Sequence, residues 1–349
     1  MGVTTSPRHA DGLAARSIRF ALTVMAPIAV ALTVGVDVWL IYAMIAGILA
    51  FTLDTGGPAL PRLAWMGSAG VIVLVGTGLG TLAAGQPVVI MAGFGIAGVL
   101  YALVESLDDT AAAGARFLCL TFAVGALYAP LESRDVGVVA GFIGYAWLVS
   151  LFWDGVGGGL RASTAPSLRE VYARLQASER DRWMFALAVA ITIPLAYLAS
   201  QVLGLRHPYW ALLAVVIVLR ADALSSRRLI GQMLLGTALG IAAAVLYGAG
   251  ATALRQRGLD VPPHSLLLVG MAVAALLRWP FQQLSGVLGT AALTAFIMLF
   301  LEVIAGTVGA AAPAMAERLV DVAIGCGFAL LALGLDRLGQ RGLSSLRPR

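Results

Sequence analysis

Long apolar runs follow one another along almost the whole chain, and short segments rich in Arg, Pro and Gly separate them. Most runs are close to the roughly twenty residues that an α-helix needs to cross a bilayer. The strict alternation that marks the strands of a membrane barrel is nowhere sustained. The pattern therefore predicts an all-α, polytopic membrane protein with about twelve transmembrane helices. The predicted spans are residues 20–36, 38–53, 65–84, 87–104, 112–130, 135–153, 183–204, 207–220, 229–250, 265–279, 286–305 and 315–335.

The composition agrees with this pattern, because 60% of the residues are hydrophobic and only 12% are charged, with a mean hydropathy of +0.92. A soluble domain carries roughly a quarter charged residues. The net charge of +5 would also fit a nucleic-acid partner, but all 23 basic residues are Arg and most lie between apolar runs. We interpret them as a topology signal and expect no nucleic-acid partner.

The distribution of these arginines predicts the orientation in the membrane. If the N-terminus faces the cytoplasm, 18 of the 23 arginines lie in segments on that side. Short loops rich in Arg remain on the cytoplasmic side during insertion. We therefore expect a multi-pass protein with both termini in the cytoplasm.

One connection between apolar runs, at residues 154–182, is long and polar. It contains Ser167-Leu168-Arg169-Glu170, a capping box that predicts a short amphipathic helix ending near Arg180. We therefore divide the chain into three parts. Residues 1–153 form a first six-helix transmembrane repeat, residues 154–182 a cytoplasmic linker, and residues 183–349 a second six-helix repeat.

The evidence for a repeat is that residues of the first half recur in the second half in the same order, at an almost constant separation up to Gly70 and at a separation enlarged by loop residues in the later pairs. An even number of helices in each half makes the two repeats parallel, related by an axis along the membrane normal. Chance matching of small apolar residues is the alternative explanation. The pairs are Phe20 with Phe185, Pro27 with Pro194, Tyr42 with Tyr209, Asp54 with Asp222, Arg62 with Arg228, Gly70 with Gly236, Leu120-Thr121 with Leu293-Thr294, and Asp135 with Asp321.

Two corresponding apolar runs, Val38–Leu53 and Pro208–Leu219, are unusually short. Paired short segments indicate the substrate site of a transporter, although a tilted helix pair in a thin region explains them equally well. Near the second run, aromatic rings are available for stacking, and Arg side chains can hold a carboxylate through two parallel hydrogen bonds. An interfacial aromatic belt and positive-inside arginines are the alternative. The candidate substrate-binding residues are His207, Tyr209, Trp210, Arg220 and Arg228.

Four ionisable residues, Glu302, Glu317, Arg318 and Asp321, fall within predicted spans near the outer surface. Charged groups in hydrocarbon are costly and are often present for a function. Glu317 and Asp321 are four residues apart and share a helix face, with Arg318 beside them. We hypothesise that they couple transport to protons, with Asp321 as the carrier because it lies deepest in its helix. A structural ion pair that joins helices is the equal alternative.

The sequence contains little that indicates other chemistry. Cys119 and Cys326 lie in different apolar runs and are expected to be inert buried thiols. The glycines of Gly76–Gly80 lie in an apolar run without the Lys of a phosphate-binding loop, so we interpret them as sites of close helix packing. We find no Ser/His/Asp set and no zinc-type spacing in the sequence. We therefore expect no enzyme activity, no cofactor and no metal site.

The second half carries a recognisable set of motifs. Residues 207–220 read HPYWALLAVVIVLR, residues 226–228 read SRR and residues 236–240 read GTALG, and a closing motif occupies Glu317 to Cys326. Together with weaker echoes in the first half, these motifs resemble the aromatic acid exporter family, which includes fusaric acid resistance (FUSC) type membrane transporters. The resemblance extends over roughly residues 20–335.

This resemblance implies an exporter in the bacterial inner membrane that moves aromatic carboxylic acids or related drugs at the expense of the proton gradient. It also implies a homo-oligomer or a periplasmic efflux partner. Larger relatives carry a substantial cytoplasmic domain after the first half, whereas only residues 154–182 occupy that position here.

Three functions are compatible with the sequence. The first is a secondary transporter whose partners are the lipid bilayer, a small organic anion and protons. The second is a channel-like anion conductor, because an Arg-lined pore fits both activities. The third is a membrane scaffold that transports nothing and whose charges are structural. We consider efflux of aromatic or other organic anions the leading hypothesis.

Overall fold

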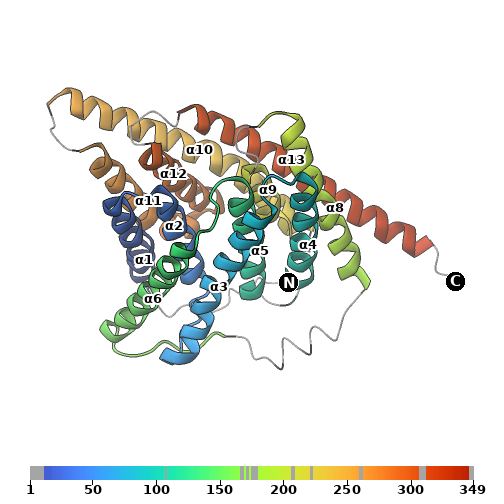
Figure 1. Cartoon of the computed structure of the whole chain (residues 1–349), viewed down its shortest axis with the longest axis horizontal. Helices are drawn as coiled ribbons and strands as arrows, with labels where there is room; N and C mark the ends of the chain where they lie inside the picture. The colour runs from blue at the N-terminus through green and yellow to red at the C-terminus, as the bar shows by residue number, and fades with distance from the viewer. Residues whose placement is uncertain are drawn as a thin grey trace.

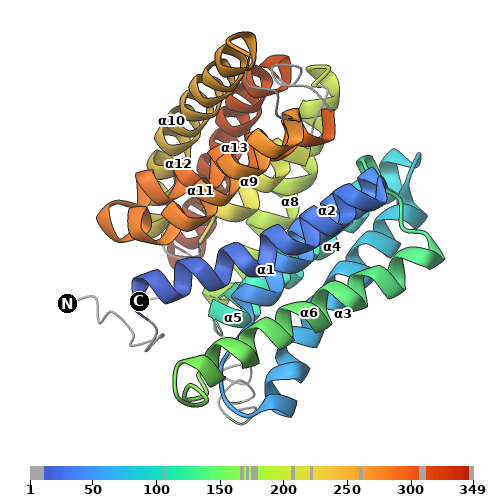
Figure 2. The ribbon, with the colours of Figure 1, turned by 90° about the vertical axis from the view of Figure 1, so that its left-hand side faces the viewer.

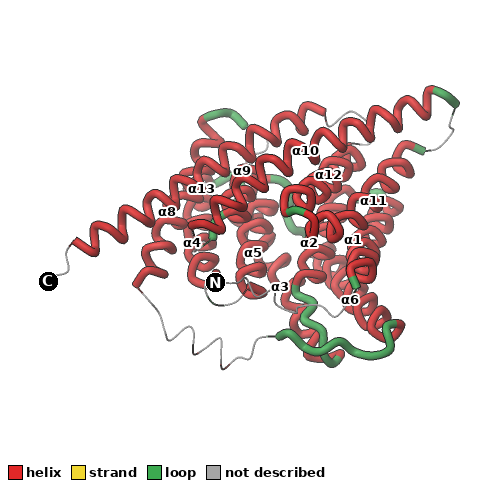
Figure 3. The backbone as a smooth tube through the Cα atoms, turned by 180° about the vertical axis from the view of Figure 1, so that it is seen from behind, coloured by secondary structure: helices red, strands yellow, loops and turns green. Residues whose placement is uncertain are grey.

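The computed structural model describes residues 12–105, 107, 109–165, 169, 173, 180–205, 209–220, 223–258, 262–305 and 312–345. In these residues all regular secondary structure is α-helical (Figures 1 and 3), so the all-α fold class is confirmed. The helices are α1 (Leu13–Val34), α2 (Asp37–Thr52), α3 (Ala59–Ala83), α4 (Pro87–Glu105), α5 (Asp109–Leu127), α6 (Ser133–Val156), α8 (Arg180–Val202), α9 (Tyr209–Val218), α10 (Ala223–Gln256), α11 (Pro263–Leu284), α12 (Gly286–Ala305) and α13 (Ala312–Ser345).

Each of these twelve helices overlaps one predicted span, but only ten of them are long and apolar enough to cross a membrane. The two exceptions are α2, with 16 residues, and α9, with 10 residues. At 1.5 Å per residue they extend about 24 Å and about 15 Å, less than the hydrocarbon core of about 30 Å. Ten of the twelve predicted spans are therefore candidate membrane spans by length and composition. The two short helices coincide with the two short apolar runs.

The helices of the first and second halves gather on opposite sides of the molecule, as Figure 2 shows for α1–α6 and α8–α13. Within the halves, α3 packs against α5, and α10 packs against α12. Two seams join the halves, one where α1 packs against α11 and one where α4 packs against α8. The short helix α9 also contacts α5 across the boundary between the halves, and most of the described side chains of α2 and α9 are buried.

The outward faces of the long helices are apolar, which is the reverse of a soluble protein. Large aliphatic side chains are exposed there because hydrocarbon, not water, is their surroundings. The protein is therefore a multi-pass membrane protein in contact with the lipid bilayer. Exposed residues of this kind include Val71, Leu79, Ile96, Leu148, Leu235, Leu246 and Val269.

Glycines permit the close approach of α3 to α5. A Cβ atom at Gly76 would overlap the Thr121 hydroxyl, and a Cβ at Gly80 would overlap the backbone carbonyl of Phe122. Small residues are the usual means by which membrane helices bring their backbones together. The interpretation of this glycine run as a packing surface is confirmed at both positions.

Parts of the predicted linker can be compared with the structure. Helix α6 continues to Val156, so the linker begins as helix, and residues up to 165 are described. The amphipathic helix predicted between Ser167 and Arg180 lies outside the continuously described residues.

We expect Gly80→Ala to lower the free energy of unfolding by about 1–3 kcal/mol, because the new methyl group meets backbone that cannot rotate away. Gly78 in the same helix is the matched control, since its Cβ would meet nothing closer than Leu131 Cδ2 at 3.5 Å. Gly78→Ala should leave stability unchanged or raise it by up to about 1 kcal/mol. Thermal unfolding of the purified variants measures both. Equal melting temperatures for the two variants would refute the packing interpretation.

Candidate functional site

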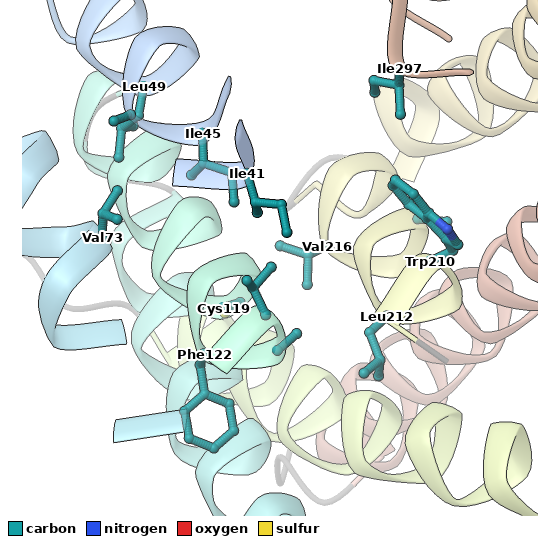
Figure 4. Packing of buried hydrophobic residues seen from close by; sticks show 14 of the residues in the cluster. Ile41, Ile45, Leu49, Val73, Cys119, Phe122, Trp210, Leu212, Val216 and Ile297 are labelled. Atoms are coloured by element: carbon teal, nitrogen blue, oxygen red, sulfur yellow. The ribbon is translucent and has the colours of Figure 1, made fainter. Parts of the chain in front are cut away.

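A cavity of about 330 Å³ lies between the two halves of the bundle. Helices α2 and α5 line it from the first half, and α9 and α12 line it from the second, with Arg278 added from α11. Figure 4 shows Ile41 and Ile45 of α2 across from Val216 and Trp210 of α9. A volume of this size lies within the range of roughly 300–1,000 Å³ that is typical of small-molecule sites.

The cavity walls are apolar because the lining helices turn one aliphatic stripe towards it. On α2 this stripe is Ile41, Ile45 and Ile48, and on α5 it includes Leu120 and Val124, at the spacing of one helical turn. Helices α2 and α5 run in opposite directions. The cavity therefore has one end where α2 stops and α5 begins, and a second end where α2 begins and α5 stops.

Two arginines, Arg116 of α5 and Arg278 of α11, line the first end, which we call the arginine end. The Nη1 atom of Arg278 is buried, and no hydrogen-bond partner reaches it from the described part of the chain. The side chain is held by aromatic rings instead, with its Cζ 5.2 Å from the centre of the Phe20 ring and 5.1 Å from that of Trp279. Arg16 stacks on the same Trp279 ring at 3.5 Å. A carboxylate would satisfy the buried donor of Arg278.

Arg116 has a carboxylate partner. Its Nη2 atom lies 3.6 Å from Oε2 of Glu105, the last residue of α4. Arg220, which follows α9, places its Nη1 atom 3.4 Å from both oxygens of the same carboxylate. Glu105 therefore stands between an arginine that faces the cavity and an arginine of the opposite half.

A second cluster of charges near this end is largely buried and lies within the first half. Asp54, in the loop between α2 and α3, accepts hydrogen bonds from Arg19 at 2.7 Å, from Arg161 at 2.6 Å and from the Ser150 hydroxyl at 2.6 Å. Asp154 of α6 accepts from Arg62 at 2.5 Å and from Arg161 at 2.6 Å. We call these six residues the Asp54 cluster.

The pKa of Asp54 is determined by two opposing effects. Burial favours the neutral acid and would raise the pKa, but the guanidinium groups of Arg19 and Arg161 favour the carboxylate. The arginines prevail, and the pKa of Asp54 is lower than its ordinary value. Asp54 is therefore a permanent anion at neutral pH.

Arg161 brings the start of the linker into this cluster. Its backbone carbonyl accepts a hydrogen bond from the Gly57 amide, and the Thr164 amide donates to the Thr55 carbonyl. Gly56 and Gly57 both have positive φ, and a Cβ at Gly56 would lie 2.8 Å from the Ala162 carbonyl oxygen. The start of the linker can lie this close to the α2–α3 loop because Gly56 and Gly57 have no side chains.

The opposite end of the cavity, which we call the tryptophan end, contains Trp210 at the start of α9 and Tyr128 after α5. The guanidinium of Arg318 lies over the Trp210 ring at 3.7 Å. Asp321, one turn further along α13, is buried, and within the described residues no hydrogen-bond partner reaches its Oδ2 atom. Asp135, which the predicted repeat pairs with Asp321, accepts hydrogen bonds from Trp39 Nε1 and from the Glu132 amide, both at 2.9 Å.

Comparison with known proteins bears on the second half of the chain. Residues 195–332 match a family model described as fusaric acid resistance protein-like. The resemblance seen in the sequence is confirmed over these residues. No curated protein and no solved structure matches the chain. The fusaric-acid-resistance-like region runs from α8 into α13, and it contributes Trp210 and Arg278 to the cavity lining and Arg318 to the contact with Trp210.

The structure brings some of the predicted substrate-binding residues together and separates others. Trp210 lines the cavity, whereas Arg220 pairs with Glu105 and Arg228 is exposed on α10. His207 and the side chain of Tyr209 lie outside the described residues.

Among the predicted proton-coupling residues, Asp321, Arg318 and Glu302 are buried and Glu317 is half-buried. Of these four residues, Arg318 contacts the tryptophan end directly, through the Trp210 ring.

Sequence reasoning missed Arg116, Arg278 and Glu105 as site residues. We counted both arginines only as topology signals, because each lies near the predicted cytoplasmic end of its helix. Arg116 lies inside the predicted span 112–130, and Arg278 is the last residue but one of the span 265–279. An Arg inside an apolar run is the signal that could have identified them.

We expect Asp54→Asn to lower the free energy of unfolding by about 3–5 kcal/mol, because the change takes the Asp54 anion from the buried Arg19 and leaves Arg161 with Asp154 alone. Glu132→Gln is the control, since the Glu132–Arg134 pair is about 60% exposed and such pairs contribute less than about 1 kcal/mol. Thermal or denaturant unfolding measures the difference.

The pH dependence of this difference follows from the lowered pKa of Asp54. The contribution of a carboxylate with a lowered folded-state pKa is fully present above its unfolded pKa of about 4 and is lost as the pH falls through the folded pKa. The gap between wild type and Asp54→Asn should therefore stay constant from pH 7 to about pH 5 and narrow only in more acidic solution. A gap that closes near neutral pH would contradict this account.

Proposed function

We propose that the protein is a secondary transporter of the inner membrane that exports aromatic carboxylic acids or related organic anions in exchange for protons. The observation that carries the proposal is the cavity between the halves. Its long apolar walls suit a ring, and the two arginines at one end suit a carboxylate. An arginine side chain presents two parallel N–H donors, which match the two oxygens of a carboxylate.

The arrangement of the lining helices supports two parallel repeats. The cavity is lined by α2 and α5 in the first half and by α9 and α12 in the second, which are the helices that the repeat would make equivalent. The two seams are equivalent in the same way, because α1–α11 and α4–α8 exchange when the halves are exchanged. A central site between parallel repeats is a common design for alternating access, in which one half rocks against the other.

The distribution of arginines supports an orientation in which the arginine end faces the cytoplasm. Both termini and the linker then lie on that side as well. A ligand from the cytoplasm would meet Arg116 and Arg278 first, and it would leave past Trp210. Exposed positive charge near the entrance would also raise the local concentration of anions.

Asp321 and its neighbours support proton coupling at the tryptophan end. Asp321 is buried with an Oδ2 atom that accepts no hydrogen bond from the described residues, which suits a carboxyl group that takes up a proton. Arg318 connects it to the cavity wall through Trp210. We propose Asp321 as the proton carrier, with Glu302, Glu317 and Arg318 as its surroundings.

Flux measurements in reconstituted vesicles test the function as a whole. A transporter accumulates an aromatic carboxylate such as benzoate when a proton gradient is imposed. A channel-like conductor instead gives a voltage-driven current without accumulation against a gradient, and a scaffold gives no flux. Either of the last two results would refute the proposal.

We expect Arg278→Gln to weaken benzoate binding by about 10- to 100-fold, the range of a charge-assisted hydrogen bond in a poorly hydrated site. Arg278→Lys should recover only part of the affinity, because Lys keeps the charge and loses the planar fork. Arg255→Gln, at the exposed end of α10, is the matched control and should bind like wild type. Equilibrium binding to purified protein measures all three. Wild-type affinity in Arg278→Gln would remove this residue from the site.

We expect Asp321→Asn to abolish proton-driven flux while the protein still folds and exchanges benzoate across the membrane. Asp135→Asn is the control, because Asp135 is fully hydrogen-bonded and should matter for stability instead. If Asp321 and Arg318 form a structural pair, Asp321→Asn will melt at a lower temperature. Adding Arg318→Gln to that variant will then restore the melting temperature. Stability and flux measured on the same samples separate the two, and normal driven flux in a stable Asp321→Asn would refute the carrier role.

A further inference from the structure

Glu105 occupies an unusual position, because one carboxylate serves an arginine of the cavity and an arginine of the other half. Arg116 belongs to α5 and lines the cavity, while Arg220 follows α9 and is absent from the lining. The side chain of Glu105 is 9% exposed, and those of Arg116 and Arg220 are 19% and 23% exposed. The carboxylate is thus close to the cavity without being part of its wall.

The geometry of this group differs from that of the Asp54 cluster. The charged contacts of Asp54 and Asp154 include distances of 2.5–2.7 Å, which are typical of strong, charge-assisted hydrogen bonds. The Glu105 contacts are 3.4 Å to Arg220 and 3.6 Å to Arg116. Contacts of this length are weaker than those of the Asp54 cluster, because hydrogen bonding and Coulomb attraction both decline with distance. The Asp54 cluster is built to stay together, and the Glu105 group is not.

A ligand carboxylate at the arginine end would compete directly with Glu105. Both groups are anions that seek the same guanidinium of Arg116, and two carboxylates at one guanidinium repel each other. Arg220 offers Glu105 a second partner that needs no large movement, because it already lies 3.4 Å from both carboxylate oxygens. The backbone around this partner is anchored, since the Tyr101 hydroxyl donates to the Leu219 carbonyl beside it.

We propose that Glu105 is an internal competitor for the ligand, which occupies Arg116 while the cavity is empty and moves fully onto Arg220 when an organic anion binds. This role rests on the proposed function, because it needs an anion in the cavity. Its effect is to weaken anion binding, so that a bound anion leaves again. Glu105 thereby sets the balance between capture and release.

The first test is benzoate binding to purified Glu105→Gln, with benzamide as the uncharged probe of the same shape. Removal of the competitor should tighten benzoate binding by about three- to ten-fold, the range of a single weak hydrogen bond. Benzamide binding should not change. Glu105→Asp, whose shorter side chain reaches Arg116 less well, should lie between wild type and Glu105→Gln. An unchanged benzoate affinity, or an equal gain for benzamide, would overturn the proposal.

The second test separates competition from a general effect of charge. Arg220→Gln removes the alternative partner, so Glu105 should hold Arg116 more firmly and benzoate affinity should fall. In the double variant with Glu105→Gln, the loss of Arg220 should have no further effect. If Arg220 holds the ligand directly, or acts only through its field, its removal will weaken binding equally in both backgrounds. That additive result would also overturn the proposal.

Transport kinetics give an independent readout. In vesicles, Glu105→Gln should lower both the KM and the maximal rate for benzoate, because tighter binding slows release. A purely structural role predicts a lower maximal rate with an unchanged KM and an early melt, which would contradict the competitor role. If wild type binds no benzoate at all, the proposed function itself fails, and this result is distinct from equal binding by wild type and Glu105→Gln.

Discussion

The need of a buried guanidinium for a partner is the constraint on which the described arrangement depends. Arginines near one end of the helices meet this need in three different ways. In the Asp54 cluster, short hydrogen bonds to two aspartates satisfy them. Around Glu105, two arginines share one carboxylate at longer distances. Arg278 is held mainly by aromatic rings. The arginines in these three environments therefore differ in how readily they can bind a further anion.

These differences in pairing distinguish the arginines that hold the structure together from those that line the cavity. The Asp54 cluster ties together α1, the α2–α3 loop, α3, α6 and the start of the linker, so it gives the first half one rigid end. Helix α2 emerges from that end and lines the cavity with one face. A rigid support of this kind holds lining residues in place without contact to a ligand. The cavity arginines stand next to it, and the buried Nη1 of Arg278 has no hydrogen-bond partner among the described residues.

The short helices explain why the cavity exists between the halves. Helices α2 and α9 are too short to cross the hydrocarbon core, and each runs at its C-terminal end into buried backbone, at Leu53 and at Leu219. Backbone that ends at membrane depth is tolerated only where protein or a hydrated cavity surrounds it. Both short helices line the cavity, and the loops that follow them carry Asp54 and Arg220. The two short helices therefore account both for the cavity and for the charged residues near its end.

The sequence by itself determined the twelve helices, the two short runs and the resemblance that the family model confirms over residues 195–332. These features follow from local composition and spacing, which a single sequence contains. It also led to Trp210, because an aromatic residue at the start of a short run is visible locally. Only the tertiary structure decided that Arg116 and Arg278 face one cavity and that Arg220 pairs with Glu105, 115 positions away. An Arg at a helix end looks the same in sequence whether it meets headgroups, a carboxylate or a cavity. The packing of helices from opposite halves makes that distinction, and no pattern within one helix records it.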